Sequence, residues 1–167
     1  GLSERCITFG VPDLLAGYNS YYQLVQGPDA VIFLSEKIHD ARIVYLNNRP
    51  HAPSSVRTYV GDSRGHWDGD TLVVDTVAIK PDLLLGGFTS IRMSDQLRFE
   101  ERMRLVGKNE LQDEFTLHDP AALTAPFKVT FSFSRVTDTN RMIDETECDS
   151  TTDRNPVVNG RFTFENR

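Results

Sequence analysis

The feature that most constrains this fold is a glycine-containing turn between two alternating segments in residues 61–75. Asp68-Gly69 separates residues 57–67 from residues 71–78, and apolar and polar side chains alternate on both sides of it. An Asp-Gly pair in this position predicts a tight β-hairpin with a type I′ turn, because both residues tolerate a positive φ. We therefore expect antiparallel strands around this turn.

Further segments of the same kind extend the β pattern along the chain. Strand-like runs with turn residues between them are expected at residues 21–26, 30–46, 96–106, 110–118, 127–134 and 141–148, with a weaker one at 161–164. The run at 30–46 is too long for one strand, so we expect a bulge or a turn near His39-Asp40. Residues 81–94 are apolar but interrupted by glycine, which favours a flap.

The number and spacing of these strands predict the fold class. Eight or nine strands with short connections and almost no helical pattern predict an all-β protein. We expect an antiparallel, lipocalin-like β-barrel, and the alternative is a β-sandwich. The 167 residues fit one domain, with residues 149–167 as a weakly predicted tail. A barrel of about eight strands can hold one small ligand.

Composition and motifs exclude several classes of function. The net charge is −6 and no basic stripe is present, which argues against nucleic acid as a partner. No apolar run is long enough for a membrane span. The sequence has no nucleophile elbow, phosphate loop or dinucleotide fingerprint, and its four His residues show no ligand spacing. We predict no metal and no cofactor.

Two acidic residues interrupt the apolar side of the expected hairpin at 96–118. Glu101 falls among Phe99 and Met103, and Asp113 falls between Leu111 and Phe115. A carboxylate that points inward must be paired, hydrated or functional to offset its desolvation. Glu101 is therefore either part of an internal ion pair or a catalytic group.

The densest group of titratable side chains lies in residues 36–42. With a period of two, Ile32, Leu34, Glu36, Asp40 and Arg42 share one face, unless a bulge intervenes. We expect His39 to act as a general base, Asp40 to orient its partner and Arg42 to stabilise negative charge. The alternative is a structural salt bridge that fixes a bent strand.

Other side chains are candidates for contact with a ligand. Trp67 is expected as an apolar wall of the core or of a pocket, and Tyr22 as a hydroxyl that reaches the interior. Glu36 and Asp113 would add polar groups, and Leu84 and Phe88 would close the flap over the ligand. The patch around Leu84 and Phe88 is alternatively a contact between subunits of a homo-oligomer.

Several motifs together resemble those of a large, poorly characterised group of bacterial exported proteins. They are GLSERC at residues 1–6, Tyr18-Asn19, EKIHDAR at 36–42, Arg49-Pro50-His51, and GDSRGHWDGDTLVVDT at 61–76. The resemblance runs from residue 1 to about residue 120, and more loosely to Cys148. It implies that this chain, which begins at Gly1 without a signal peptide, is the C-terminal portion of a longer precursor and is periplasmic or secreted.

The resemblance also bears on the two cysteines and on the ligand. By themselves Cys6 and Cys148 could form a bridge or remain separate buried thiols, and the implied compartment favours the bridge. Relatives carry a Cys-His-Glu-Gly-Asn-Tyr run where this chain has Cys-Asp-Ser-Thr at 148–151, so the role of that His is absent. Their segment matching residues 81–94 is polar, so the apolar one here suggests an apolar ligand.

Together these observations predict a barrel that binds a small hydrophobic or aromatic molecule. The leading hypothesis is cofactor-free acid–base chemistry of the lyase, isomerase or cyclase type. The alternatives are a non-catalytic extracytoplasmic ligand-binding protein and a subunit of an assembly.

Overall fold

The computed structural model describes most of the chain between residues 21 and 141. The described residues are 2, 5–11, 21–36, 38, 40–81, 92–138, 140, 141, 157, 158, 161 and 162. They contain ten strands and no α-helix, which confirms the all-β prediction. His39, Leu84, Phe88, Cys148 and most of the predicted flap and tail lie outside the described residues.

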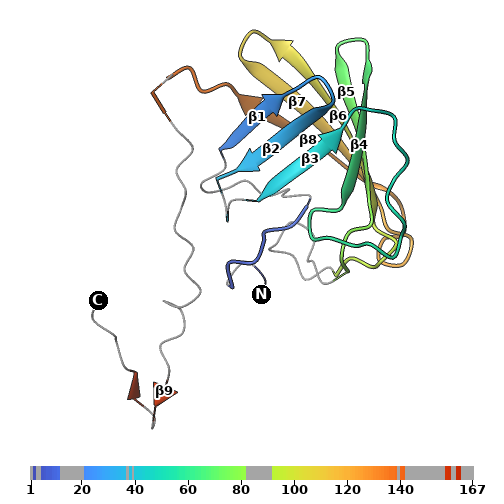
Figure 1. The fold of residues 1–167 in the computed structure, drawn as a ribbon, viewed down its shortest axis with the longest axis vertical. Coiled ribbons are helices and arrows are strands. Elements are labelled where there is room, and N and C mark those ends of the chain that lie inside the picture. Colours follow the sequence, from blue (N-terminus) through green and yellow to red (C-terminus); the bar gives the residue numbers. More distant parts are fainter. Residues whose placement is uncertain are drawn as a thin grey trace.

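Eight strands form one sheet, which curls strongly (Figure 1). The strands are β1 (Tyr22–Gln26), β2 (Ala30–Ser35), β3 (Ala41–Tyr45), β4 (Asp62–Asp68), β5 (Thr71–Val77), β6 (Arg98–Gly107), β7 (Glu110–His118) and β8 (Phe127–Ser134). A separate short hairpin pairs β9 (Val157–Val158) with β10 (Arg161–Phe162). Of these two strands, β10 lies inside the weakly predicted strand at 161–164.

The strands follow one another in the sheet in chain order, from β1 at one edge to β8 at the other. Every neighbouring pair is antiparallel except β3 and β4, which run parallel through the pairs Val44↔Ser63 and Tyr45↔Arg64. A parallel pair needs a long crossover, and residues 46–61 provide it. The result is a half-barrel in a single sheet, as the barrel prediction required, rather than a sandwich.

The β4–β5 hairpin forms as predicted, but its turn lies one residue later. Asp68 pairs with Thr71, so Gly69 and Asp70 are the two central residues. Gly69 has a φ of 63°, whereas Asp70 is not among the residues with positive φ. This is the pattern of a type II′ turn, with Gly first, and the predicted type I′ turn is wrong.

The long run at 30–46 is divided into two antiparallel strands by a turn. Phe33 pairs with Arg42 and Val31 with Val44, so these four side chains share the inner face. The turn reverses the predicted alternation, because Ile32 pairs with Ile43 on the outer face. The predicted interruption of the run is confirmed between Ser35 and Ala41, and it removes the common face that an unbroken period of two would give Ile32, Leu34 and Arg42.

The core consists of two clusters of hydrophobic side chains. One contains Val31, Val44, Leu72, Val74 and Met103, and Leu111 packs against it. The other contains Ile79, Met93, Leu97, Phe99, Phe115 and Leu117. Both clusters draw residues from β5, β6 and β7 or from the segments next to them, because the inner face of these strands is apolar at alternate positions.

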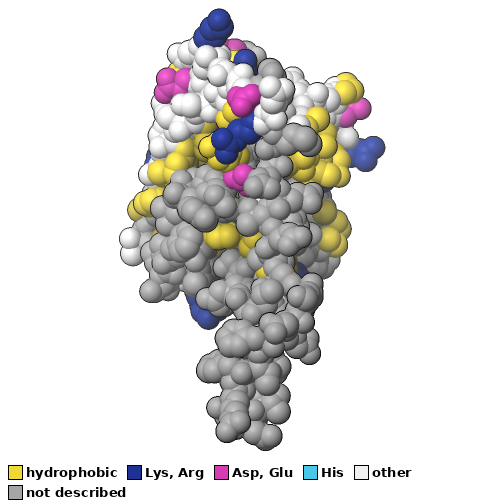
Figure 2. All heavy atoms as spheres, turned by 90° about the vertical axis from the view of Figure 1, so that its left-hand side faces the viewer, with side chains coloured by type: hydrophobic (Ala, Val, Ile, Leu, Met, Phe, Trp, Pro, Cys, Tyr) yellow, Lys and Arg dark blue, Asp and Glu magenta, His cyan; other side chains and the backbone are white. Residues whose placement is uncertain are grey.

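The two edges of the sheet approach each other through side chains. The rings of Tyr22 on β1 and Phe133 on β8 are in edge-to-face contact, with centroids 6.0 Å apart. Seen from the side where β1 lies in Figure 1, hydrophobic side chains form a band across the molecule (Figure 2). No helix among the described residues is long and apolar enough to cross a membrane.

Candidate functional site

The interior of the half-barrel contains a buried ion pair between Arg42 and Glu101. Arg42 Nη1 lies 2.5 Å from Glu101 Oε2, and Nη2 lies 2.7 Å from Oε1. Glu101 is fully buried and Arg42 is 9% exposed. The two predicted site residues are therefore brought together, in the bidentate geometry that gives strong charge-assisted hydrogen bonds.

This pair connects strands that are not neighbours in the sheet. Arg42 projects inward from β3 and Glu101 from β6, and β4 and β5 lie between them. The Arg42 guanidinium also lies 4.7 Å from the ring centroid of Phe33 and 5.9 Å from that of Phe99. Burial alone would lower the pKa of Arg42, but the charge and hydrogen bonds of Glu101 more than offset it and the pKa is raised. The contact with Glu101 therefore stabilises the charged form of Arg42.

Asp113 lies beside this pair and is the unusual member of the cluster. It is 4% exposed, and its Oδ1 has no hydrogen-bond partner among the described residues. Burial, and then the negative charge of Glu101, raise the pKa of Asp113 to about 8, although Arg42 opposes the shift. At neutral pH the side chain is mainly a neutral carboxylic acid, which can donate one hydrogen bond.

The three polar side chains form a layer between the two hydrophobic clusters. On β6, Glu101 follows Phe99 of one cluster and precedes Met103 of the other. On β7, Asp113 lies in the same way between Leu111 and Phe115. The alternating pattern of each strand places these residues on the inner face, so the sequence could predict their burial. It could not predict that Arg42 meets them, since 59 positions separate it from Glu101.

Two further predicted residues lie near the rim of this interior. Tyr22 is close enough to Arg42 to help raise its pKa. Glu36 is buried at the end of β2, where its Oε2 accepts a hydrogen bond of 3.4 Å from the backbone N–H of Tyr21. Glu36 therefore joins the ends of β1 and β2.

Asp40 holds the N-terminal segment against the sheet. Its two carboxylate oxygens accept hydrogen bonds of 2.8 and 2.7 Å from the Thr8 hydroxyl, and Oδ2 also accepts one of 2.8 Å from the backbone N–H of Phe9. The role predicted for Asp40, to orient His39, stays a prediction because His39 lies outside the described residues. The same holds for Leu84 and Phe88 as the flap contacts.

Trp67 does not occupy the predicted place in the core. Its side chain is 47% exposed near the end of β4, two residues before the turn. Its strand position has inward parity, like Ser63 and Gly65, and its cross-strand partner Leu72 is buried in the core. The prediction of a buried wall is nevertheless wrong, because the Trp67 side chain itself stays in contact with solvent.

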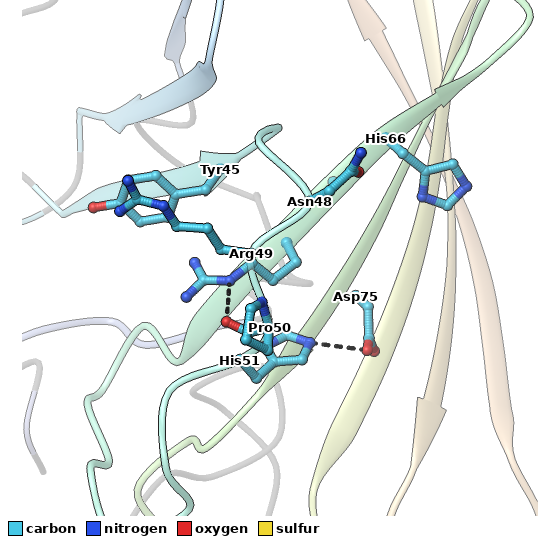
Figure 3. A pocket seen from close by; sticks show the side chains of 9 residues that line it. Tyr45, Asn48, Arg49, Pro50, His51, His66 and Asp75 are labelled. Carbon is cyan, nitrogen blue, oxygen red and sulfur yellow. Dashed lines mark hydrogen bonds and ion pairs between the residues drawn. The ribbon is translucent and has the colours of Figure 1, made fainter.

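A second group of titratable side chains lies on the outer face of β4 and β5. His51, from the crossover segment, places Nδ1 2.8 Å from Asp62 Oδ2 and Nε2 3.1 Å from Asp75 Oδ2. Asp62 also pairs with Arg64 at 3.0 Å, and Asp75 with Arg98 at 2.7 Å. This group borders a shallow pocket of about 260 Å³ (Figure 3).

The sequence did not predict that these residues meet, although their spacing along the hairpin is regular. Asp62, Arg64 and Asp75 occupy alternate, outward positions of the hairpin, and they pair across it or with His51. Outward charges usually contact only water, so the pattern alone gives no reason to expect a site. The described residues contain no group of three or more His, Cys, Asp or Glu side chains placed to bind a metal ion.

Comparison with known proteins adds no assignment. No protein family, no curated protein and no solved structure matches this chain.

Proposed function

We propose that the inner face of the half-barrel binds a small, largely apolar molecule and that Asp113 exchanges a proton with it. The observation that carries this proposal is the buried carboxyl of Asp113, whose Oδ1 has no partner in the described part of the chain and whose pKa is raised to about 8. A buried polar atom without a partner costs about 1–3 kcal/mol. A ligand with one hydroxyl or carbonyl group would satisfy it.

The surroundings of Asp113 favour a ligand that is otherwise apolar. Phe115 and Phe131 make an edge-to-face contact with centroids 5.7 Å apart, and Phe99 lies against Phe115 at 5.8 Å. Aromatic surroundings of this kind favour contact with an aromatic or aliphatic molecule whose one polar group is directed at the carboxyl.

The proton transfer is assigned to Asp113 rather than to Glu101. Both oxygens of Glu101 accept hydrogen bonds from Arg42, so both are already occupied by a protein donor. Asp113 has no such partner, and its raised pKa makes the ionised form a stronger base than an ordinary carboxylate. Chemistry of the lyase or isomerase type needs such a group to remove a proton next to a carbonyl. The role of His39 as a general base remains a separate prediction.

Binding is tested with a matched pair of probes. 1-Naphthol and naphthalene share an apolar ring system, and only 1-naphthol can hydrogen-bond to Asp113. We expect 1-naphthol to bind about tenfold more tightly in fluorescence titrations, as one buried hydrogen bond would give. Asp113→Leu should remove this difference, whereas Glu114→Gln, on the exposed face of β7, should leave it unchanged. No binding of either probe, or an unchanged preference in Asp113→Leu, would reject the proposal.

Catalysis is tested by proton exchange with solvent. 2-Tetralone is a small apolar ketone with an acidic C–H bond beside its carbonyl. Ionised Asp113 would take this proton, and in D2O the resulting enolate would take up a deuteron in its place. Proton NMR should therefore show that the C–H signal beside the carbonyl is lost faster with the wild type than with Asp113→Asn. The enzymatic rate should rise with pH through about 8. Equal rates for the two proteins, together with selective binding of 1-naphthol, would establish a binding protein without catalysis.

The non-catalytic alternative has a specific observation in its favour. The charge of Arg42 is compensated by Glu101 within 2.5–2.7 Å, so Arg42 has less positive potential to offer an enolate. The localisation outside the cytoplasm, which rests on the family resemblance, belongs with this proposal and suits a carrier of apolar molecules. The subunit hypothesis depends on Leu84 and Phe88 and stays a prediction.

A further inference from the structure

The shallow pocket on the outer face lies on the opposite side of the sheet from the buried carboxyls. It is lined by side chains and backbone of Tyr45, Asn48, Arg49, Pro50, His51, Arg64, Gly65, His66 and Asp75. Figure 3 shows these residues coming from the end of β3, from the crossover segment and from β4 and β5. The pocket therefore exists because β3 and β4 are parallel and the chain must cross over this face.

The charged side chains that line the pocket carry a positive surplus. Arg49 and Arg64 line the pocket with one acidic residue, Asp75, and the chain as a whole has a net charge of −6. Arg64 is compensated by Asp62, 3.0 Å away, and Asp75 by Arg98, 2.7 Å away, so the surplus is the single positive charge of Arg49. A local excess of positive charge in an acidic protein favours a small anion over a cation or a neutral molecule.

Arg49 is the cation of this pocket that has no protein acceptor. In the described part of the chain, its guanidinium makes no hydrogen bond or ion pair with any side chain. The backbone N–H of Arg49 does have an acceptor there, which is Asn47 Oδ1. Arg64, in contrast, is occupied: Nε donates to the carbonyl of Pro50 at 3.2 Å, and Nη2 pairs with Asp62. Arg49 thus offers a free planar donor pair to a phosphate or a carboxylate.

The rest of the pocket is held in place by contacts of the kind that fix a binding site before its ligand arrives. His51 is fixed between Asp62 and Asp75, and the backbone N–H of Ala52 donates to Asp62 at 2.9 Å. The guanidinium of Arg64 lies 5.0 Å from the ring centroid of Tyr45, whose side chain remains 40% exposed. A ring on the ligand could pack on Tyr45 and Pro50 while its anionic group meets Arg49.

We infer that this pocket binds a small molecule that carries a phosphate or carboxylate group next to a ring. Arg49 supplies the main charge-assisted hydrogen bonds, and the lining also contains the exposed imidazole of His66 and the amide of Asn48. This site is independent of Asp113, so either proposal can fail without the other.

The inference is tested by NMR titration with three probes that share a benzene ring. Phenyl phosphate and benzoate carry the two anionic groups, and benzyl alcohol is neutral. We expect the first two to shift the amide signals of residues 48–51 and 66 with saturation, and benzyl alcohol to leave them unchanged. Whichever anion binds more tightly identifies the group that the pocket prefers.

Two variants separate a specific site from general attraction of anions. Arg49→Gln should weaken the binding of the preferred anion about tenfold, as expected for the loss of a charge-assisted hydrogen bond. Arg104→Gln removes an exposed arginine of β6 whose guanidinium donates a hydrogen bond of 3.2 Å to Gln112 Oε1, and it should leave the affinity unchanged. Equal losses in the two variants, unchanged affinity in Arg49→Gln, or equal shifts with benzyl alcohol would overturn the inference.

Discussion

At the scale of single residues, Asp113 and Arg42 show opposite solutions to the burial of charge. Arg42 stays ionised because Glu101 binds it through two hydrogen bonds. Oδ1 of Asp113 finds no partner among the residues that the structure describes, and Asp113 instead keeps its proton, since burial and the nearby charge of Glu101 disfavour the carboxylate. The same low-polarity surroundings therefore produce one ion pair and one neutral acid.

The raised pKa of Asp113 should make the folded protein lose stability as pH rises. The pKa of an Asp in the unfolded chain is about 3.9. In the folded protein the pKa of Asp113 is about 8. The stabilisation is complete below pH 4 and is lost progressively between about pH 4 and pH 8. Asp113→Asn cannot ionise, so urea midpoints measured from pH 5 to pH 8 should fall less steeply for this variant than for the wild type. Parallel curves would contradict the shift.

Removal of Arg42 alone should be strongly destabilising. Arg42→Met leaves the buried carboxyl of Glu101 without its partner, and breaking a buried pair in this way costs roughly 3–5 kcal/mol. The double variant Arg42→Met with Glu101→Met should recover most of this loss, because neither charge then remains buried. Urea unfolding of the three proteins measures the effect, and Arg102→Met, which breaks an exposed pair with Asp68, should stay close to the wild type. A double variant as unstable as Arg42→Met would contradict the explanation.

At the scale of elements, the β4–β5 hairpin and the crossover segment determine the shape of the sheet. Gly65 lies in β4 where the end of β3 comes closest, and an added Cβ would lie 2.7 Å from Val44 Cγ1 and 3.0 Å from Leu46 Cδ2. The absence of a side chain at Gly65 is therefore what allows the parallel β3–β4 pairing to pack tightly.

Gly65→Ala should test this close approach. The extra methyl group would overpack the interior at a cost of about 1–3 kcal/mol, measured by thermal or urea unfolding. Val44→Ala in the same chain removes the nearest obstructing atom, so the double variant should lose less stability than the sum of the two single changes. Additive losses would show that the space around Gly65 is not the limiting factor.

At the scale of the whole molecule, the sheet is an open half-barrel whose edge strands meet through side chains. Within the described residues β1 and β8 form no backbone ladder with each other, and the Tyr22–Phe133 ring contact links the two edges. An aromatic pair contributes about 0.5–1.5 kcal/mol beyond its buried area. We therefore regard this contact as a determinant of how far the half-barrel opens.

Phe133→Ala should loosen both edges of the sheet at once. Loss of the ring contact should accelerate amide hydrogen exchange in β1 and in β8 by about threefold to tenfold, while the central strands β5 and β6 keep their rates. Phe127→Ala provides the control on the same strand, because Phe127 is 44% exposed and is not part of this contact. Similar exchange in β1 for the two variants would contradict the role of Phe133.

The sequence by itself determined the local elements and the faces of most of them. Alternation placed Glu101 and Asp113 on the inner face of β6 and β7, and turn residues marked the hairpins, because period and turn chemistry are local properties of the chain. Local rules also misplaced two features: the turn at Gly69-Asp70 was shifted by one residue, and Trp67 was given a buried position although its side chain is 47% exposed.

Only the tertiary structure decided which distant residues meet. The parallel pairing of β3 and β4, the ion pair from Arg42 to Glu101 and the bridge from His51 to Asp62 and Asp75 all join segments that are separate in the sequence. Such contacts depend on the curl of the sheet and on the path of the crossover segment. Both are set by the packing of the whole domain, and no local pattern of residues carries that information.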